Sequence, residues 1–191
     1  ALRERWAAIT GAGRVTPIDW DAETIQAGGV TVLHGDCAAR NKEPVLLNTL
    51  TALMQGGREQ VVVQTPYIIC NRAMYDALEK AGGAAQVQII TNAPQRGANP
   101  WGCADYLNQK KAILSTGVSV CEWHGERSMH TKTILIDDRF SIIGSFNWDM
   151  RSAYLDTELM LLVDCPELNA ALRAETDEMV RQGRLLLPDG T

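Results

Sequence analysis

The apolar and polar positions alternate between strand-like and helix-like segments over the first half of the chain. Short apolar runs typical of buried strands occupy residues 30–34, 61–67 and 87–92. Between these runs, leucines at helical spacing after Pro44 and an apolar stripe after Asn71 each predict a helix that ends at glycine. A third helix is expected over residues 104–115, after the glycine- and proline-rich loop 93–102.

The pattern changes after residue 117, where strand-like segments follow one another closely. These segments occupy residues 118–123, 130–136, 140–147 and 157–164. A last helix is predicted over residues 166–182. Alternation followed by a hairpin-rich section predicts an α/β fold, a mixed central β-sheet with helices on both faces, as in an α-β-α sandwich. Residues 1–29 show weak periodicity and are interpreted as a lead-in segment before one domain at 30–191.

Composition narrows the class of protein. The five cysteines are scattered and lack a C-x-x-C pair, which disfavours a disulfide framework and favours a reducing compartment. A net charge of −5 argues against a broad nucleic-acid-binding surface. No apolar run approaches the roughly 18–20 residues needed to cross a bilayer, so the expected location is cytoplasmic or peripheral at a membrane.

The candidate chemistry lies on two of the predicted strands. Side chains alternate faces along a strand, so His130 and Lys132 should point the same way from one strand, and Ser145 and Asn147 the same way from the next. A short turn makes the two strands plausible antiparallel neighbours, and the four side chains are expected to converge. Gly144 would permit close approach of backbone or ligand beside them.

Two carboxylates flank this set. Asp137 has the opposite parity and is interpreted as a turn anchor rather than a catalytic acid. Glu158 could accept a hydrogen bond from one nitrogen of His130 and leave the other free to attack. The combination of a lysine charge, neutral donors and a histidine suits a tetrahedral anion. The pattern calls for no metal and no cofactor; two ordinary polar-faced strands are the alternative, which the complete set of spacings disfavours.

The spacing H-x-K-x4-D followed by G-S-x-N resembles the signature of the phospholipase D superfamily. The matching residues are His130, Lys132, Asp137, Gly144, Ser145 and Asn147. The longer run at 144–163 resembles the bacterial cardiolipin synthase-like branch, although Asp156 stands where that branch commonly has asparagine. The resemblance implies that residues 30–191 form a phospholipase D-like catalytic domain with one such motif, and that residues 1–29 connect two lobes.

The family resemblance also implies a mechanism and a partner. Exchange at phosphorus would pass through a phosphohistidine, with one histidine attacking and a histidine from a second motif protonating the leaving oxygen. His34 and His124 have no lysine two residues later, so a second motif must come from elsewhere. It could belong to another lobe of the same parent chain, with this chain as the C-terminal lobe, or to a symmetry-related copy. In the bilobal case His130 could be the general acid and base.

The leading hypothesis is a phosphatidyltransferase or phosphodiesterase of the cardiolipin synthase type, acting on a phosphatidylglycerol-like phospholipid at the bacterial membrane. The expected catalytic residues are His130, Lys132, Asn147 and Glu158, with Lys132, Ser145 and Asn147 on the phosphate and Asp137 and Gly144 as structural residues. One alternative is a homodimeric phosphodiesterase nuclease, although nucleic acid suits the acidic composition poorly. Another is a module that binds anions without turnover.

Overall fold

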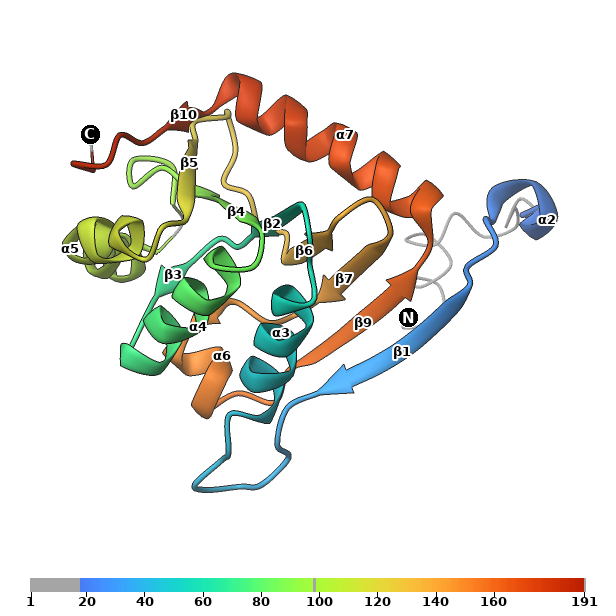
Figure 1. The fold of residues 1–191 in the computed structure, drawn as a ribbon, viewed down its shortest axis with the longest axis horizontal. Helices are drawn as coiled ribbons and strands as arrows, with labels where there is room; N and C mark the ends of the chain where they lie inside the picture. The colour runs from blue at the N-terminus through green and yellow to red at the C-terminus, as the bar shows by residue number, and fades with distance from the viewer. Residues whose placement is uncertain (1–17, 98, 191) are drawn as a thin grey trace, which may run out of the picture.

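The computed structural model describes residues 18–97 and 99–190 and contains a mixed eight-stranded sheet in the order β1-β9-β7-β6-β2-β4-β5-β10 (Figure 1). Its strands are β1 (Gly29–His34), β2 (Gln60–Gln64), β4 (Gln86–Asn92), β5 (Ser119–Trp123), β6 (Thr133–Ile136), β7 (Phe140–Gly144), β9 (Leu159–Asp164) and β10 (Arg184–Leu185). Strands β2, β4 and β5 run parallel, and the other neighbouring pairs are antiparallel. The predicted mixed α/β sheet is confirmed.

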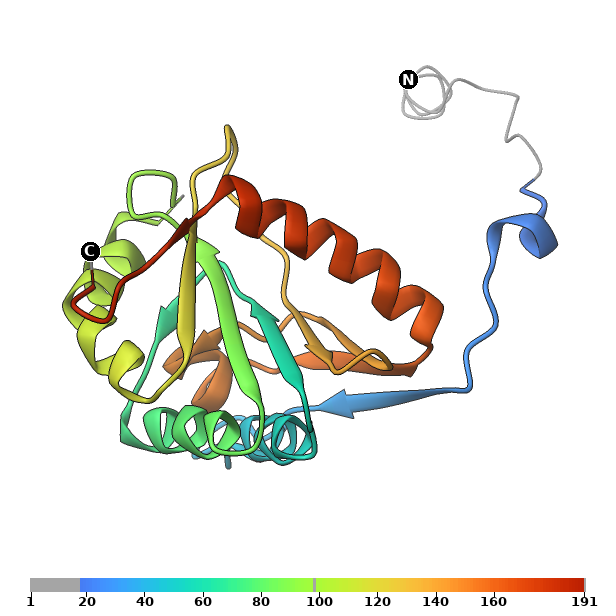
Figure 2. The same cartoon turned by 45° about the horizontal axis from the view of Figure 1, so that its top comes forward.

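Helices cover both faces of this sheet. Figure 2 shows α3 (Val45–Gln55) and α4 (Arg72–Gly82) below it and α7 (Pro166–Gln182) above it. The remaining elements are α2 (Trp20–Glu23), α5 (Pro100–Ser115), α6 (Met150–Tyr154) and a two-stranded parallel sheet of β3 (Ile68–Ile69) and β8 (Trp148–Asp149). The cap predicted at Asn71 is present, because its side chain accepts the N–H of Met74.

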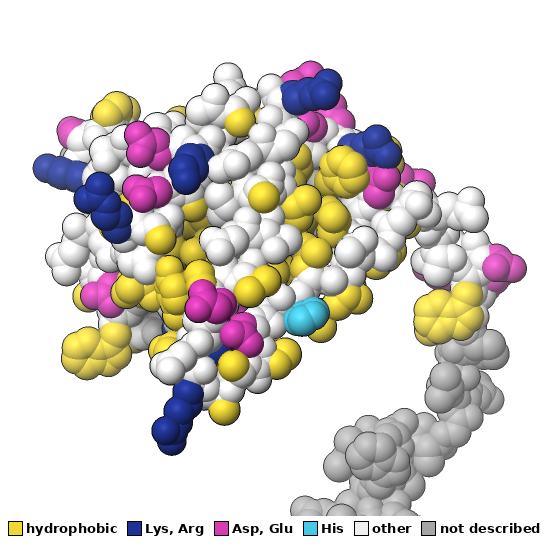
Figure 3. Space-filling model, turned by 60° about the horizontal axis from the view of Figure 1, so that its bottom comes forward, with side chains coloured by type: hydrophobic (Ala, Val, Ile, Leu, Met, Phe, Trp, Pro, Cys, Tyr) yellow, Lys and Arg dark blue, Asp and Glu magenta, His cyan; other side chains and the backbone are white. Residues whose placement is uncertain are grey.

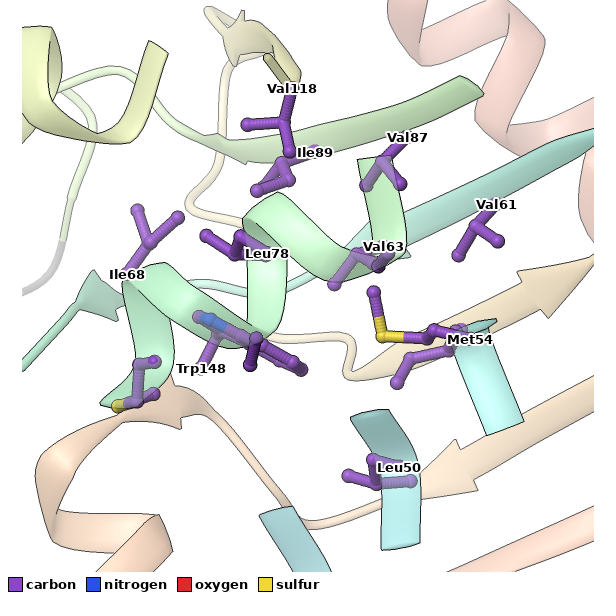
Figure 4. Packing of buried hydrophobic residues seen from close by; sticks show 14 of the residues in the cluster. Leu50, Met54, Val61, Val63, Ile68, Leu78, Val87, Ile89, Val118 and Trp148 are labelled. Carbon is purple, nitrogen blue, oxygen red and sulfur yellow. The ribbon is translucent and has the colours of Figure 1, made fainter. Parts of the chain in front are cut away.

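The core lies in two layers, one on each side of the sheet. The three valines of β2 show why: Val61 and Val63 face α3 and α4, whereas Val62 faces α7. The larger layer includes Leu50, Met54, Leu78 and Trp148, which pack together in Figure 4. A strand that is buried on both faces has a continuous run of apolar residues, which is why β2 could be predicted from the sequence.

Several boundaries differ from the predicted ones. Helix α5 begins at Pro100 rather than residue 104, since the Asn99 side chain accepts the N–H groups of Trp101 and Gly102 and caps it earlier. The strands predicted at 130–136 and 140–147 are shorter, and the motif residues outside them have no regular structure or lie in a bend. Neither α6 nor β8 was expected.

The predicted lead-in, residues 1–29, lies mostly outside the described residues. Within its described part, α2 is capped by the side chain of Asp19, and β1 begins at Gly29 and pairs with β9. The division at residue 30 therefore stays a prediction. In the part of the chain that the structure describes, no helix is both long enough and apolar enough to span a bilayer.

Candidate active site

His130 and Lys132 meet on the segment that leads into β6. The Nζ atom of Lys132 lies 2.8 Å from Nδ1 of His130 and 2.7 Å from the His130 carbonyl oxygen. His130 is exposed, whereas Lys132 is buried. The two side chains therefore converge as expected, but not as neighbours on one face of a strand. The lysine instead folds back onto the preceding histidine.

The Lys132 ammonium is a buried charge between carboxylates. Burial lowers the pKa of Lys132, and the negative charges of Glu158 and Asp149 partly offset that effect. Both carboxylates are themselves buried. Burial also raises the pKa of Asp149, although the N–H groups of Ser152 and Arg151 act in the opposite direction. The site thus concentrates one cation and two acidic groups where solvent screening is weak.

A chain of hydrogen bonds joins Glu158 to Asn147. Ser152 Oγ donates to Oε1 of Glu158 at 2.6 Å, and it accepts from the backbone N–H and the Nδ2 of Asn147 at 3.1 and 3.3 Å. A hydroxyl has a single hydrogen, so its oxygen must accept both bonds from Asn147. This turns Nδ2 of Asn147 toward Ser152. Its Oδ1 is buried and has no hydrogen-bond partner among the described residues.

The contact expected between Glu158 and His130 is not among the hydrogen bonds of the described residues. Glu158 bonds to Ser152 instead, because α6 is inserted between β8 and β9 and brings Ser152 next to the carboxylate. The neighbour of the imidazole is Lys132. Glu158 therefore reaches the rest of the site through Ser152 and through its charge on Lys132.

Gly144 and Ser145 hold β7 against its neighbours. Gly144 donates its N–H to the Lys132 carbonyl at 3.2 Å, and a Cβ atom there would collide with the carbonyl oxygen of Leu159 and with Met160. The space expected beside Gly144 is therefore filled by β9 rather than left for a ligand. Ser145 Oγ accepts the N–H of Leu159 at 3.0 Å, so its hydroxyl is already engaged with the backbone.

Asp137 lies at the opposite end of the β6–β7 hairpin and points away from the histidine. Its carboxylate accepts the N–H groups of Arg58, Glu59 and Gln60, and its φ of 47° is left-handed. Burial alone would raise the pKa of Asp137, but these donors hold it below its usual value. Asp137 anchors the turn, as its position in the strand pattern indicated.

Two further residues position the site. The ring of Tyr67 packs edge-on against that of His130, with centroids 6.3 Å apart. The amide of Asn92 accepts the N–H of Met129 at 2.8 Å and donates to its carbonyl at 2.9 Å, which fixes the backbone just before the histidine. Tyr67 follows β2 and Asn92 is the last residue of β4, and this place at a strand end was their only signal in the sequence. In the described part of the chain, no metal-binding group of three or more His, Cys, Asp or Glu side chains occurs.

Comparison with known proteins gives consistent results. The family described as "Cardiolipin synthase, PLD-like domain" matches residues 50–180. Cardiolipin synthase A from Salmonella arizonae and from Salmonella newport are each 26% identical over 197 residues. The match covers 93% of this chain but 39% of these relatives, so the chain spans well under half of their length.

Two solved structures share the fold. Nuc from Salmonella typhimurium, a phospholipase D family member, superposes with a TM-score of 0.66 at 16% identity, covering 82% of this chain and 98% of Nuc. Phosphatidylserine synthase from Haemophilus influenzae gives a TM-score of 0.61 at 22% identity, covering 82% of this chain and 40% of the synthase. At these identities the likeness concerns the fold alone.

Proposed function

Because this chain belongs to the cardiolipin synthase, PLD-like domain family, we propose that it supplies one half of a site that exchanges the alcohol of a phospholipid phosphodiester. The pairing of His130 with the buried ammonium of Lys132, 2.8 Å from Nδ1, carries this proposal. A fixed positive charge beside an imidazole suits an anionic phosphorus centre, because it stabilises charge that develops on the phosphoryl oxygens.

The lysine also controls the state of the histidine. An ammonium can only donate, so the nearer ring nitrogen of His130 accepts from Lys132. A bound phosphate oxygen competes for the same ammonium and releases that nitrogen. In this scheme, substrate binding releases the His130 nitrogen from Lys132 so that it can react. Before substrate binds, the hydrogen bond to Lys132 keeps that nitrogen from reacting.

The exchange of alcohols at phosphorus then takes two steps. A histidine nitrogen forms a bond to phosphorus while the ester bond to the first alcohol breaks, and a second histidine gives its proton to the leaving oxygen. The acceptor hydroxyl, from a second lipid or from water, then attacks phosphorus, breaks the phosphorus–nitrogen bond and returns a proton to the second histidine. His130 fills one of these two roles, and the other belongs to a second motif.

The neighbouring residues take supporting roles in this proposal. Asn147 accepts a hydrogen bond from the incoming hydroxyl, since its Oδ1 can only accept and is buried without a hydrogen-bond partner among the described residues. Ser145 helps to close the loop around the phosphate through its bond to Leu159. Glu158 is a positioning residue that acts through Ser152.

The second motif needs a surface on which to dock. Val30, Val32, Leu159 and Leu161 are exposed, and the strand register places them on one face of β1 and β9. Helix α7 covers the same sheet face farther along, over β4 to β7. We propose that a second H-x-K domain covers this open area, which adjoins Ser145, either as another lobe of the parent chain or as a symmetry-related copy.

The net charge of −5 supports a lipid substrate better than nucleic acid. On the face in Figure 3, lysine and arginine side chains lie singly among aspartate and glutamate rather than in one track. A polynucleotide needs a continuous basic path along its backbone. We place the protein at the cytoplasmic membrane surface, where its substrate resides.

One assay tests the function against its alternatives. The full-length protein is incubated with phosphatidylglycerol vesicles and, separately, with duplex DNA, beside a His130→Asn variant. We expect turnover of the lipid that the variant loses and no cleavage of DNA. Cleavage of DNA alone would show a nuclease, and phosphate binding without turnover of either substrate would show a binding module.

A further inference from the structure

A cleft of about 470 Å³ opens beside the proposed site, between the start of α5, β3 and α6. Three of its lining residues also belong to the site: Tyr67 packs against His130, Asn147 bonds to Ser152, and the charge of Asp149 acts on Lys132. The apolar part of its lining comes from Ile69, Trp101, Met150 and Leu155. His130 and Lys132 do not themselves line the cleft, so it adjoins the proposed phosphate position through these shared residues.

Large apolar side chains stand in solvent around this cleft. Trp101 is 83% exposed, Leu155 is 69% exposed and Met150 is also exposed. Trp101 lies on α5, Met150 on α6 and Leu155 directly after α6, so segments far apart in the sequence contribute to one cleft. We call these three residues the apolar rim. Folding gains little from them, and exposed apolar groups around a cleft are typical of a contact with an apolar ligand or surface.

The charges of the cleft argue against a second anion. Among the described residues, Arg151 is the one cation that lines the cleft, and its Nε already pairs with Asp156 Oδ2 at 2.9 Å. The carboxylates of Asp105, Asp149 and Asp156 also line it. Three carboxylates against one paired guanidinium would repel a further phosphate group. The part of the ligand that enters the cleft should therefore be uncharged.

Size limits how much of a lipid can enter. Pockets for small ligands span roughly 300–1,000 Å³, so the cleft would take the glycerol and the first part of an acyl chain but not a complete diacyl lipid. The rest of the chains would stay in the bilayer. A tryptophan at the mouth fits that arrangement, because indole rings favour the boundary between apolar and aqueous phases.

We propose that the cleft receives the glycerol and the proximal acyl segment of a bilayer phospholipid whose phosphate lies at His130 and Lys132, and that the apolar rim touches the membrane surface. This inference rests on the proposed function of the same site. It adds the direction from which the lipid enters and the surface that contacts the bilayer.

Vesicle binding tests this inference with matched controls. The full-length protein is mixed with vesicles of phosphatidylglycerol and phosphatidylethanolamine, and bound protein is measured by flotation. Trp101→Ser and Leu155→Ser should each weaken binding about tenfold, since each loses apolar burial at the interface. Trp20 and Leu187, which are 65% and 60% exposed and lie outside the cleft lining, provide controls. Trp20→Ser and Leu187→Ser should change binding by less than about twofold.

A second measurement separates binding from turnover. The rate of the Trp101→Ser variant should fall about tenfold more on vesicles than on a short-chain phosphatidylglycerol that is monomeric in water.

Equal vesicle binding by Trp101→Ser and Trp20→Ser would overturn the inference, whatever the turnover. Vesicle binding that depends on Trp101, without turnover of any phosphodiester by the wild type, would instead refute the proposed function. If Trp101→Ser splits an assembly into smaller species in gel filtration, protein covers the rim and the inference is wrong.

Discussion

The two ends of the β6–β7 hairpin carry residues of the same sequence motif, but they differ in how far their polar groups are hydrogen-bonded. At the turn, the carboxylate of Asp137 accepts three backbone N–H groups. At the other end, His130 is exposed and the amide oxygen of Asn147 is buried without a hydrogen-bond partner in the described part of the chain. Satisfied groups stabilise a fold, whereas unsatisfied ones are available to a ligand. On this contrast we propose that Asp137 serves stability and that His130 serves function.

The largest expected effect falls at the exposed end. His130→Asn should lower turnover of phosphatidylglycerol about a thousandfold or more, because it removes the nucleophile or proton carrier. Its free energy of unfolding should change by less than about 0.5 kcal/mol, since the side chain is exposed. Steady-state rates and urea unfolding measure the two effects. The control is His124→Asn, which should keep its activity; equal loss in both variants would remove His130 from the proposed chemistry.

The turn should behave in the reverse way. Asp137→Ala removes the acceptor for three backbone N–H groups and should lower the free energy of unfolding by about 2 kcal/mol. Alanine also tolerates the left-handed φ of 47° less well than aspartate does. Urea unfolding measures the loss.

Asp137→Ala should lose stability but keep its activity, which is the reverse of the result expected for His130→Asn. Turnover per folded molecule should stay within about twofold of the wild type, because the carboxylate does not reach the site. Asp138→Ala, in the same turn, is the matched control and should lose less stability. A folded Asp137→Ala protein without activity would contradict the division between the two ends.

The layers of the fold and the family could both be predicted from the sequence. The apolar runs of β2 and β4 and the stripes of α3 and α4 predicted the layers, because a residue buried on a regular element repeats with that element's period. The family resemblance, also inferred from sequence spacing, is confirmed by the match over residues 50–180. Asp137 was separated from His130 on strand parity, whereas in the structure His130 lies before β6 and Asp137 in the turn after it, so distance along the hairpin separates them.

The parts that escaped prediction are short or depend on distant contacts. Two-residue strands such as β8 and the five-residue helix α6 contain too few positions to show a period. Their presence determines which partner Glu158 finds, so the expected bond to His130 was replaced by one to Ser152. Asn92 acts through Met129, thirty-seven residues away, which no local pattern could indicate.

A smaller effect should appear between the two ends, at Ser152. Ser152→Ala removes the hydroxyl that orients Asn147 and partners Glu158, and should lower kcat about tenfold with little change in KM. Glu158→Gln should act through the same hydroxyl, so the double variant should lose less than the product of the two single losses. Ser115→Ala, on the exposed end of α5, is the control. Multiplicative losses in the double variant would show that Ser152 and Glu158 act separately.

The smallest effect is the pH dependence at the turn. The folded pKa of Asp137 lies below its usual value, so its contribution to stability is complete above the unfolded pKa of about 3.9 and declines as the pH falls through the folded pKa. Asp137→Asn keeps an acceptor oxygen but has no charge to titrate. The gap in unfolding free energy between the wild type and Asp137→Asn should therefore be widest near neutral pH and narrow below pH of about 4. Other carboxylates whose pKa is lowered, such as Asp164 and Glu178, titrate alike in both proteins and cancel in the difference. Urea unfolding of both proteins at several pH values measures the gap, and a gap that stays constant into acid would mean that the charge of Asp137 does not stabilise the turn.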